Sequence, residues 1–265
     1  MGNPPDAPAP PPVLQRLAPG WVATLAYRLV PAVTTWRLTA PDGTVRFAKV
    51  DTEGRHPTLR GESERMIWAA PYLPVPTVVA LEHEGAATIL LTEALPGRDA
   101  TDPVWRDDPG ALVAALGRGL RAFHEAVGEE WCPFRFDTAR AVDHVVRRVA
   151  DDDIDPGGFH EEHRHLSPAA ALAELVATAP TDEDLVVCHG DYCPPNALLR
   201  DGAVTGYVDL GELGVADRWW DVATGGWSTC WNFGERFEPL FYEGYGIAPD
   251  PARIRFFRLL YDLVS

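Results

Sequence analysis

The chain has 265 residues, of which 46% are hydrophobic and 23% charged, so it is long enough for two modest domains or one large one. Its 39 acidic residues outnumber 23 basic ones, and the net charge of −16 argues against nucleic-acid or anionic-membrane partners, which need basic faces. The four cysteines form no CxxC pair, which predicts reduced thiols in a cytoplasmic protein.

The first twenty residues are predicted to form a disordered tail. Six prolines stand among residues 1–12, and this composition favours an extended chain over a packed one. The segment has no basic stretch followed by an apolar one, so no secretion signal is predicted. No apolar run in the chain approaches the roughly 20 residues of a membrane span.

Residues 21–95 are predicted to form a β-rich lobe. Short β-branched runs alternate with turns, and Asp42-Gly43 is a strong hairpin signal. A helix is predicted over 59–70, and Pro96-Gly97 then predicts the boundary between two lobes. The strands of this lobe are predicted at 22–27, 35–39, 44–50, 77–81 and 87–92.

Residues 96–265 are predicted to form a larger, mainly helical lobe. Asp108 before Pro109 is typical of a helix start, and apolar residues then recur every three or four positions as far as Val127. A β-rich lobe followed by a helical one is an α+β arrangement that matches the two-lobed, protein-kinase-like fold. Further helices are predicted at 141–149, 168–178 and 254–264, and strands at 185–188, 196–199 and 204–210.

The residues suited to chemistry concentrate in 185–221. Asp191, in His-Gly-Asp, is followed after four residues by Asn196, which is the spacing of a kinase catalytic loop. There the aspartate accepts the proton of the acceptor hydroxyl and the asparagine reaches metal. Asp209 stands near the end of the next predicted strand, and its hard oxygens suit Mg²⁺. A turn, a cap or a strand end explains each residue singly, but their combined spacing favours catalysis.

Lys49 is the only lysine in the chain. It lies in the predicted strand 44–50, and a strand lysine that faces phosphates is a position where arginine is no equivalent. Chance survival of one lysine in an arginine-rich sequence explains the position of Lys49 equally well, so its interpretation depends on the catalytic motif.

These motifs resemble those of the aminoglycoside O-phosphotransferase family, most of all its 3′-phosphotransferase branch. The family sequences HGDxCxPN and D-x-G-x-LGVADR-xxD recur within 185–223, and the likeness covers 21–265. The resemblance implies a protein-kinase-like fold and ATP- or GTP-dependent phosphorylation of a hydroxyl on an aminoglycoside-type antibiotic, which confers resistance. It also implies Mg²⁺ as cofactor.

By this resemblance, Asp191 is the catalytic base, and Asn196 and Asp209 hold Mg²⁺. Lys49 corresponds to the phosphate-binding lysine and Glu62 to its helix partner. On charge alone, Glu64 would serve as partner equally well. Asp217 is expected to brace the catalytic loop.

The same resemblance places the adenine of the nucleotide against backbone groups of Thr92 and Ala94. At the turn over the phosphates, either Thr34 or Thr35 would add a hydroxyl. This turn departs from the family pattern, since no glycine lies between Gly20 and Gly43, which puts its geometry and nucleotide affinity in question.

The acceptor-binding positions depart further from the family, which surrounds a polycationic sugar with carboxylates. Glu161, Glu162 and Asp262 remain as candidate ammonium partners, while Trp231 lies in an aromatic stretch, 227–233. This balance implies an acceptor with fewer amines and a ring that stacks; simple packing of the lobe is the alternative explanation.

His160, His163 and His165 do not have the HExxH order of a zinc site, and no metal is predicted there.

Two alternative functions stay open from the sequence. One is a kinase of another amine-bearing small molecule, such as a nucleoside or peptide antibiotic or a choline-like metabolite. The other is a pseudokinase that binds a ligand without transferring phosphate. The sequence does not set the oligomeric state.

Overall fold

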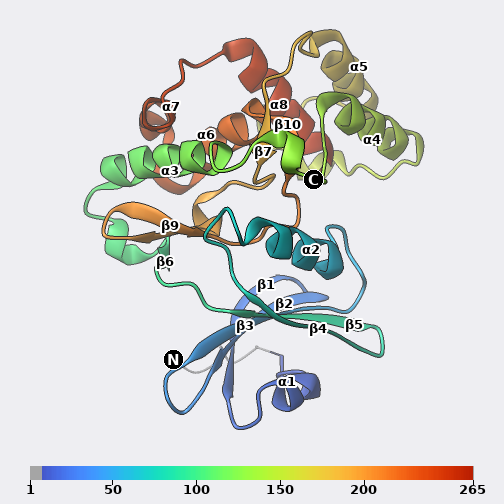
Figure 1. Ribbon diagram of the computed structural model, residues 1–265. Helices are drawn as coiled ribbons and strands as arrows, with labels where there is room; N and C mark the ends of the chain where they lie inside the picture. Colours follow the sequence, from blue (N-terminus) through green and yellow to red (C-terminus); the bar gives the residue numbers. More distant parts are fainter. Residues whose placement is uncertain (1–7, 265) are drawn as a thin grey trace. The chain divides into compact units, whose positions relative to one another are not determined.

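The computed structural model describes residues 8–264, which form two compact units (Figure 1). The first unit extends to Pro96 and also contains Gly206–Glu212; the second comprises Gly97–Thr205 and the chain from Leu213 onward. This division differs from the predicted lobes 21–95 and 96–265 chiefly because a late segment, Gly206–Glu212, belongs to the first unit.

The first unit is built on an antiparallel sheet of five strands in the order β1-β2-β3-β5-β4. Helix α2 begins after Thr58, whose hydroxyl accepts the N–H of Gly61 at 3.1 Å, which is the usual role of a threonine N-cap. The strands are β1 (Val22–Val30), β2 (Val33–Thr39), β3 (Val45–Asp51), β4 (Val78–Glu84) and β5 (Ala87–Glu93), and α2 spans Leu59–Ala69.

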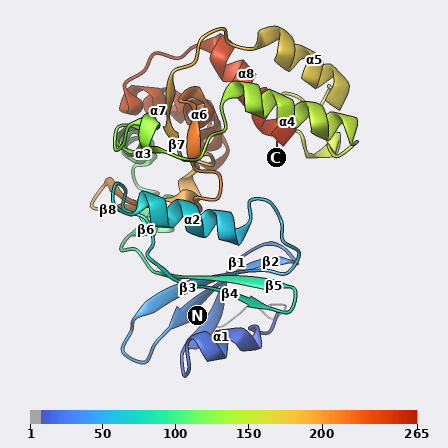
Figure 2. The same ribbon diagram turned by 45° about the vertical axis from the view of Figure 1, so that its right-hand side comes forward.

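The sheet has an apolar face that a short helix, α1 (Pro12–Leu17), covers. Figures 1 and 2 show α1 and α2 on opposite faces of this sheet. Val13 and Leu14 are buried against Trp36 and Val50, and burying such side chains contributes about 1.5–3 kcal/mol each.

The predicted disorder of residues 1–20 is therefore wrong for Pro12–Leu17, while residues 1–7 lie outside the described residues. The proline content that suggested an extended chain is compatible with a helix here, because proline suits the first helical turn. The apolar residues that follow then find a sheet face to cover.

Strand register places Lys49 on the other face of the sheet. Side chains alternate along a strand, so Lys49 points away from the face that Ala48 and Val50 share with the core. Thr35 is directly opposite Lys49 in the β2–β3 pair, and directly opposite residues share a face. Helix α2 packs against β4 and β5.

The second unit is mainly helical. Helix α3 packs closely along α7, and a Cβ atom at Gly117 would lie 2.2 Å from the carbonyl oxygen of Phe241, so only glycine fits there. Strands β7 and β10 pair antiparallel. The helices are α3 (Pro109–His124), α4 (Thr138–Ala150), α5 (Pro168–Thr178), α6 (Trp219–Phe233), α7 (Glu238–Tyr245) and α8 (Pro251–Val264), and the strands are β6 (Arg98–Asp99), β7 (Leu185–Cys188), β8 (Ala197–Arg200), β9 (Ala203–Tyr207) and β10 (Gly214–Asp217).

The α+β class is confirmed, and α5 and β7 have the predicted bounds. Helix α6 was not predicted, because Gly225 and Gly226 lower helix propensity. These glycines admit close neighbours instead: a Cβ at Gly225 would lie 2.8 Å from Cζ of Phe241. The strand predicted at 204–210 ends at Tyr207.

None of the helices within residues 8–264 combines the length and apolar character needed to cross a bilayer.

Candidate active site

Lys49 forms a three-membered ion-pair cluster within the first unit. Its Nζ donates to both carboxylate oxygens of Glu62 and to Oδ1 of Asp209, each at 2.9 Å. Glu62 comes from the first turn of α2 and is 3% exposed. The structure thus selects Glu62, and not Glu64, as the partner of Lys49.

The cluster keeps Lys49 charged. Burial alone would lower the pKa of Lys49, but the negative charges of Glu62 and Asp209 outweigh it and raise the pKa above its ordinary value. Burial is also the largest influence on Glu62, whose pKa lies above its ordinary value although Lys49 opposes the shift. The ammonium is therefore a fixed positive charge at this face of the sheet.

Asp209 is presented by a turn after β9. Its φ of +63° lies in the left-handed region, which few non-glycine residues other than Asn and Asp adopt. This turn explains why β9 ends before Asp209. The side chain is 45% exposed while one oxygen holds Lys49, so the carboxylate faces both the lysine and solvent.

The turn over the predicted phosphate site joins β1 to β2 through Pro31 and Ala32. The register of β1 against β2 shifts between Leu25 and Tyr27 and again between Arg28 and Val30, and such irregularities add twist and re-aim side chains. The hydroxyl of Thr34 accepts from the indole of Trp36 at 3.0 Å. Thr35, by its register with Lys49, lies on the lysine's face.

The predicted adenine-binding backbone lies at the end of β5. Thr92 is buried opposite Phe47, and its hydroxyl is 3.5 Å from the Phe47 carbonyl oxygen. The N–H of Ala94 donates to the carbonyl oxygen of Val45 at 3.3 Å. This long hydrogen bond would have to yield for the Ala94 N–H to reach a base.

In the second unit, the predicted catalytic loop brings Asp191 and Asn196 together. The amide nitrogen of Asn196 donates to the backbone oxygen of Asp191 at 2.9 Å and to its Oδ2 at 3.0 Å. Asn196 ends a short 3₁₀ turn, Pro194–Asn196, and is 7% exposed. Because its nitrogen faces Asp191, its amide oxygen points away from that carboxylate.

The loop before Asp191 is held by Asp221, a fully buried residue of α6. Its Oδ2 accepts the N–H of His189 at 2.6 Å and its Oδ1 the N–H of Gly190 at 2.9 Å. The indole of Trp220 donates to the Gly190 carbonyl at 2.7 Å. Gly190 has a φ of +91°, which requires glycine. The residue that positions the catalytic loop is thus Asp221.

Asp217, which was expected to brace the catalytic loop, has other partners. Its carboxylate accepts the N–H groups of Asp184 and Trp219 and the guanidinium of Arg253. Burial raises the pKa of Asp217, against the effect of these donors. It therefore ties β7, α6 and α8 together within the second unit.

His124, Cys188 and Asp221 lie close enough to hold a metal, but hydrogen bonds account for their arrangement. His124 bonds Asp221 through Nε2 at 3.0 Å and the hydroxyl of Tyr245 through Nδ1 at 2.8 Å. Burial raises the pKa of the Cys188 thiol, which disfavours the thiolate that a metal needs. Through Asp221, the group supports the predicted catalytic loop.

Asp191 lines a cavity of about 210 Å³ in the second unit. The predicted acceptor residue Trp231 lines the same cavity. Sequence reasoning missed the other polar and aromatic lining residues, because most of them sit on the unpredicted helix α6. They include Thr224, Ser228, Asn232 and, from α8, Tyr261.

The predicted acidic acceptor residues are not gathered in this cavity. Asp262 is buried, and its carboxylate accepts from Nδ1 of His160 at 2.5 Å and Nδ1 of His163 at 2.6 Å. Glu162 approaches Arg258 at 3.9 Å, and Glu161 is exposed. An acceptor ammonium would have to displace an imidazole to reach Asp262.

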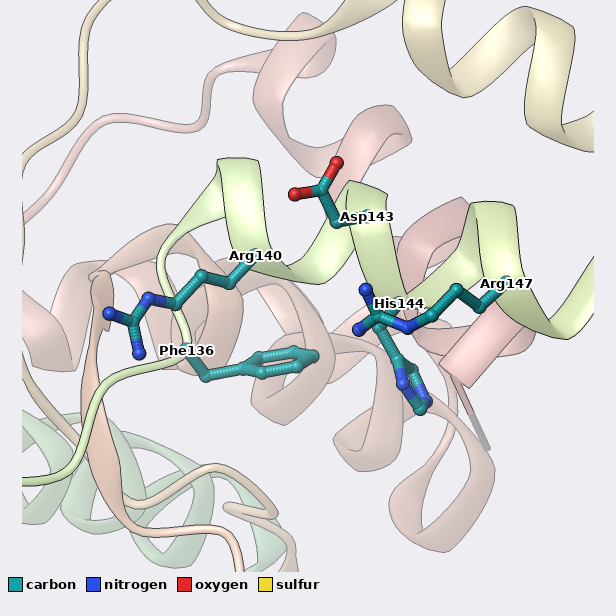
Figure 3. A pocket seen from close by; sticks show the side chains of 5 residues that line it. All are labelled: Phe136, Arg140, Asp143, His144 and Arg147. Carbon is teal, nitrogen blue, oxygen red and sulfur yellow. The ribbon is translucent and has the colours of Figure 1, made fainter.

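A second cavity of about 320 Å³ lies along α4 and contains none of the predicted site residues. Figure 3 shows its lining, in which the ring of Phe136 lies near that of His144, with centroids 6.4 Å apart. Its charged groups are Arg140, Asp143 and Arg147, and none of them belongs to the predicted catalytic loop.

Known proteins resemble this chain in sequence. Residues 32–257 match the model of the phosphotransferase enzyme family. The chain is 38% identical over 211 residues to an aminoglycoside 3′-phosphotransferase of Streptomyces fradiae, covering 76% of this chain and 78% of that one.

Two solved structures resemble the whole fold. An aminoglycoside-3′-phosphotransferase of type VIII aligns with a TM-score of 0.84 at 34% identity, over 95% of this chain and 96% of that one. The phosphotransferase APH(3″)-Id from Streptomyces rimosus, solved with ADP and streptomycin, gives 0.73 at 30% identity, over 95% and 96%. The kinase-like fold is confirmed, and the chain belongs to the phosphotransferase enzyme family.

Proposed function

We propose that the protein is a cytoplasmic O-phosphotransferase that uses ATP or GTP and Mg²⁺ to phosphorylate a hydroxyl of an aminoglycoside-type antibiotic, which confers resistance. The observation that carries the proposal is the Asp191 carboxylate, which lines a cavity while Asn196 holds it in place. The relatives named for aminoglycosides and the complex of one of them with ADP and streptomycin support this choice of substrates.

Asp191 acts on the acceptor in this proposal. One of its oxygens receives a hydrogen bond from Asn196, so the carboxylate has a fixed orientation toward the cavity. It orients the acceptor hydroxyl and accepts its proton as the oxygen attacks the terminal phosphorus of the nucleotide. The bond from that phosphorus to the bridging oxygen breaks, and the nucleoside diphosphate leaves. General bases of this kind contribute about 10²–10⁴-fold to the rate.

Lys49 acts on the nucleotide. Glu62 fixes the ammonium through two hydrogen bonds, and a compact, permanently charged donor suits phosphate oxygens. Thr35 adds a hydroxyl on the same face of the sheet, and the backbone near Thr92 and Ala94 receives the base. Positioning and charge compensation provide most of the catalysis in phosphoryl transfer.

The donor set fits Mg²⁺. The amide oxygen of Asn196, turned away from Asp191, and the half-exposed carboxylate of Asp209 are hard oxygen ligands. We assign both as ligands that would hold the ion, which would supply positive charge to offset that of the phosphates.

The test is an assay of ADP or GDP release with purified protein, Mg²⁺ and a panel of acceptors. The panel contains aminoglycosides, amino-sugar nucleoside and peptide antibiotics, and choline. Transfer to an aminoglycoside, together with raised resistance of a sensitive host that expresses the protein, is expected. Transfer to choline alone would replace the proposed substrate, and no transfer to any acceptor would favour a binding protein.

A further inference from the structure

Three aromatic side chains lie together beside the cavity that contains Asp191. We call this group the Trp231 wall, and its members are His160, Trp231 and Tyr261. The ring of His160 stacks on that of Trp231, with centroids 4.3 Å apart and planes within 3°. The ring of Tyr261 lies 6.1 Å from His160. Trp231 and Tyr261 both line the cavity that contains Asp191, and Trp231 remains 48% exposed.

Asp262 holds the His160 side of the Trp231 wall in place. This buried carboxylate accepts both the backbone N–H of His160 at 3.2 Å and its Nδ1 at 2.5 Å. The other bond to Asp262 comes from His163. The imidazole therefore has a set plane, and the carboxylate is used inside the protein and not offered to a ligand. Trp227 packs against Trp231 at 4.9 Å and holds it from another side.

The polar groups that line the cavity are mostly neutral. Its one lining carboxylate is Asp191. The other polar lining groups are hydroxyls such as that of Ser228, the amide of Asn232, the thiol of Cys193 and the indole of Trp231. The amide nitrogen of Asn232 is bound to the carbonyl of Ser228 at 2.8 Å. The cavity therefore presents aromatic rings and acceptor oxygens in place of a ring of negative charges.

A cavity with aromatic rings and few carboxylates suits a guanidinium group better than an ammonium group. An ammonium group is compact and strongly hydrated, so it needs carboxylates to offset the loss of water. A guanidinium group is planar and weakly hydrated, and it stacks on aromatic faces through cation–π interaction. The net charge of −16 attracts both kinds, but the Trp231 wall distinguishes between them.

We propose that the cavity selects an acceptor that carries a guanidinium group, which stacks on the Trp231 wall while a hydroxyl of the same molecule meets Asp191. This inference rests on the proposed phosphotransferase function and narrows its substrate class. Asp262 and His163 are positioning residues for the wall in this scheme.

The test compares streptomycin, whose cyclitol bears guanidinium groups, with kanamycin, whose cationic groups are all ammonium. Binding is measured by calorimetry and transfer by kcat/KM, for the wild type, Trp231→Leu and Trp231→Phe. Trp131→Leu is the matched control, since Trp131 is 68% exposed and is not among the residues that line the cavity.

We expect the wild type to favour streptomycin by about tenfold or more in kcat/KM, the size of a desolvated cation–π contact. Trp231→Leu should lower streptomycin kcat/KM about tenfold, mainly through KM, and change kanamycin less than twofold. Trp231→Phe should restore most of the loss, and Trp131→Leu should behave as wild type.

Equal use of the two acceptors by the wild type, or an equal loss of both in Trp231→Leu, would overturn the inference. If neither acceptor is phosphorylated, the phosphotransferase proposal fails, but calorimetry still tests the guanidinium site. Streptomycin binding that is tighter than kanamycin binding and depends on Trp231 would support that site. Absence of streptomycin binding would remove the inference itself.

Discussion

The ammonium of Lys49 is held symmetrically by Glu62, with Nζ 2.9 Å from each carboxylate oxygen. A planar guanidinium at the same backbone position would be longer and would need a different geometry. The pair thus gives a physical reason why this position alone has a lysine in a chain that otherwise uses arginine.

Lys49→Arg is expected to reduce kcat/KM for ATP about 10- to 150-fold. The charge survives, but the charge-assisted hydrogen bonds that Lys49 makes are worth about 1.5–3 kcal/mol each, and 1.36 kcal/mol is tenfold. Steady-state kinetics with varied ATP checks this. Arg200→Lys, at an exposed position, is the control, and unchanged ATP kinetics in Lys49→Arg would show that any cation suffices.

Asp191→Asn should lower kcat about 10²–10⁴-fold, because an amide does not accept the hydroxyl proton. Nucleotide binding, measured by calorimetry with a non-hydrolysable ATP analogue, should change little. A turnover close to wild type would remove Asp191 from the role of base.

Asp221→Asn should destabilise the protein and slow turnover together. An amide has one acceptor oxygen, whereas Asp221 serves His189, Gly190 and His124, so at least one buried donor loses its partner at a cost of about 1–3 kcal/mol. Denaturant unfolding and kcat are the measurements. The control is Asp201→Asn at an exposed turn, and equal stability of both variants would contradict the bracing role.

Asp262 should make the protein sensitive to acid. Burial alone would raise the pKa of Asp262, but the hydrogen bonds from His160 and His163 outweigh it and lower the pKa below its ordinary value. Stability from this group is therefore complete above the unfolded pKa of about 3.9 and is lost as pH falls through the folded pKa.

Asp262→Asn should flatten the dependence of the unfolding free energy on pH in that acidic window. Denaturant unfolding at a series of pH values measures the slope. A slope identical to that of the wild type would show that Asp262 does not contribute to it.

Removal of divalent cations should abolish transfer, and added Mg²⁺ should restore it. Asn196→Ala should raise the Mg²⁺ concentration needed for half-maximal activity, because one proposed oxygen ligand is lost. Activity that is insensitive to chelation would exclude the assigned ion.

The sequence could relate Asp191 to Asn196, which the structure brings together, because the two residues are close in the chain. Asp191 and Asn196 lie five positions apart in one loop, and a spacing rule suffices to relate them. The pair of Lys49 and Glu62 could also be predicted from the sequence, because the two residues lie on a strand and on the helix that follows it. The spacing from Lys49 already favoured Glu62 over Glu64, and the structure pairs Lys49 with Glu62.

Contacts between residues far apart in the sequence could not be predicted from local spacing. Asp221 meets Gly190 across 31 positions, and His160 meets Asp262 across 102. The periodicity of apolar residues does not indicate such long-range pairs. In addition, the glycines of α6 lower its helix propensity, so the helix that carries Asp221 and Trp231 was not predicted. Asp262 is bound by His160 and His163, and no pattern in the sequence indicated this contact.

The solitary lysine has a practical consequence for chemical labelling. Amine-directed reagents such as active esters find a single side-chain target in this protein, and it lies between two carboxylates that keep it protonated and slow to react. Faster acylation of Lys49 would therefore indicate that its ion pair with Glu62 is broken.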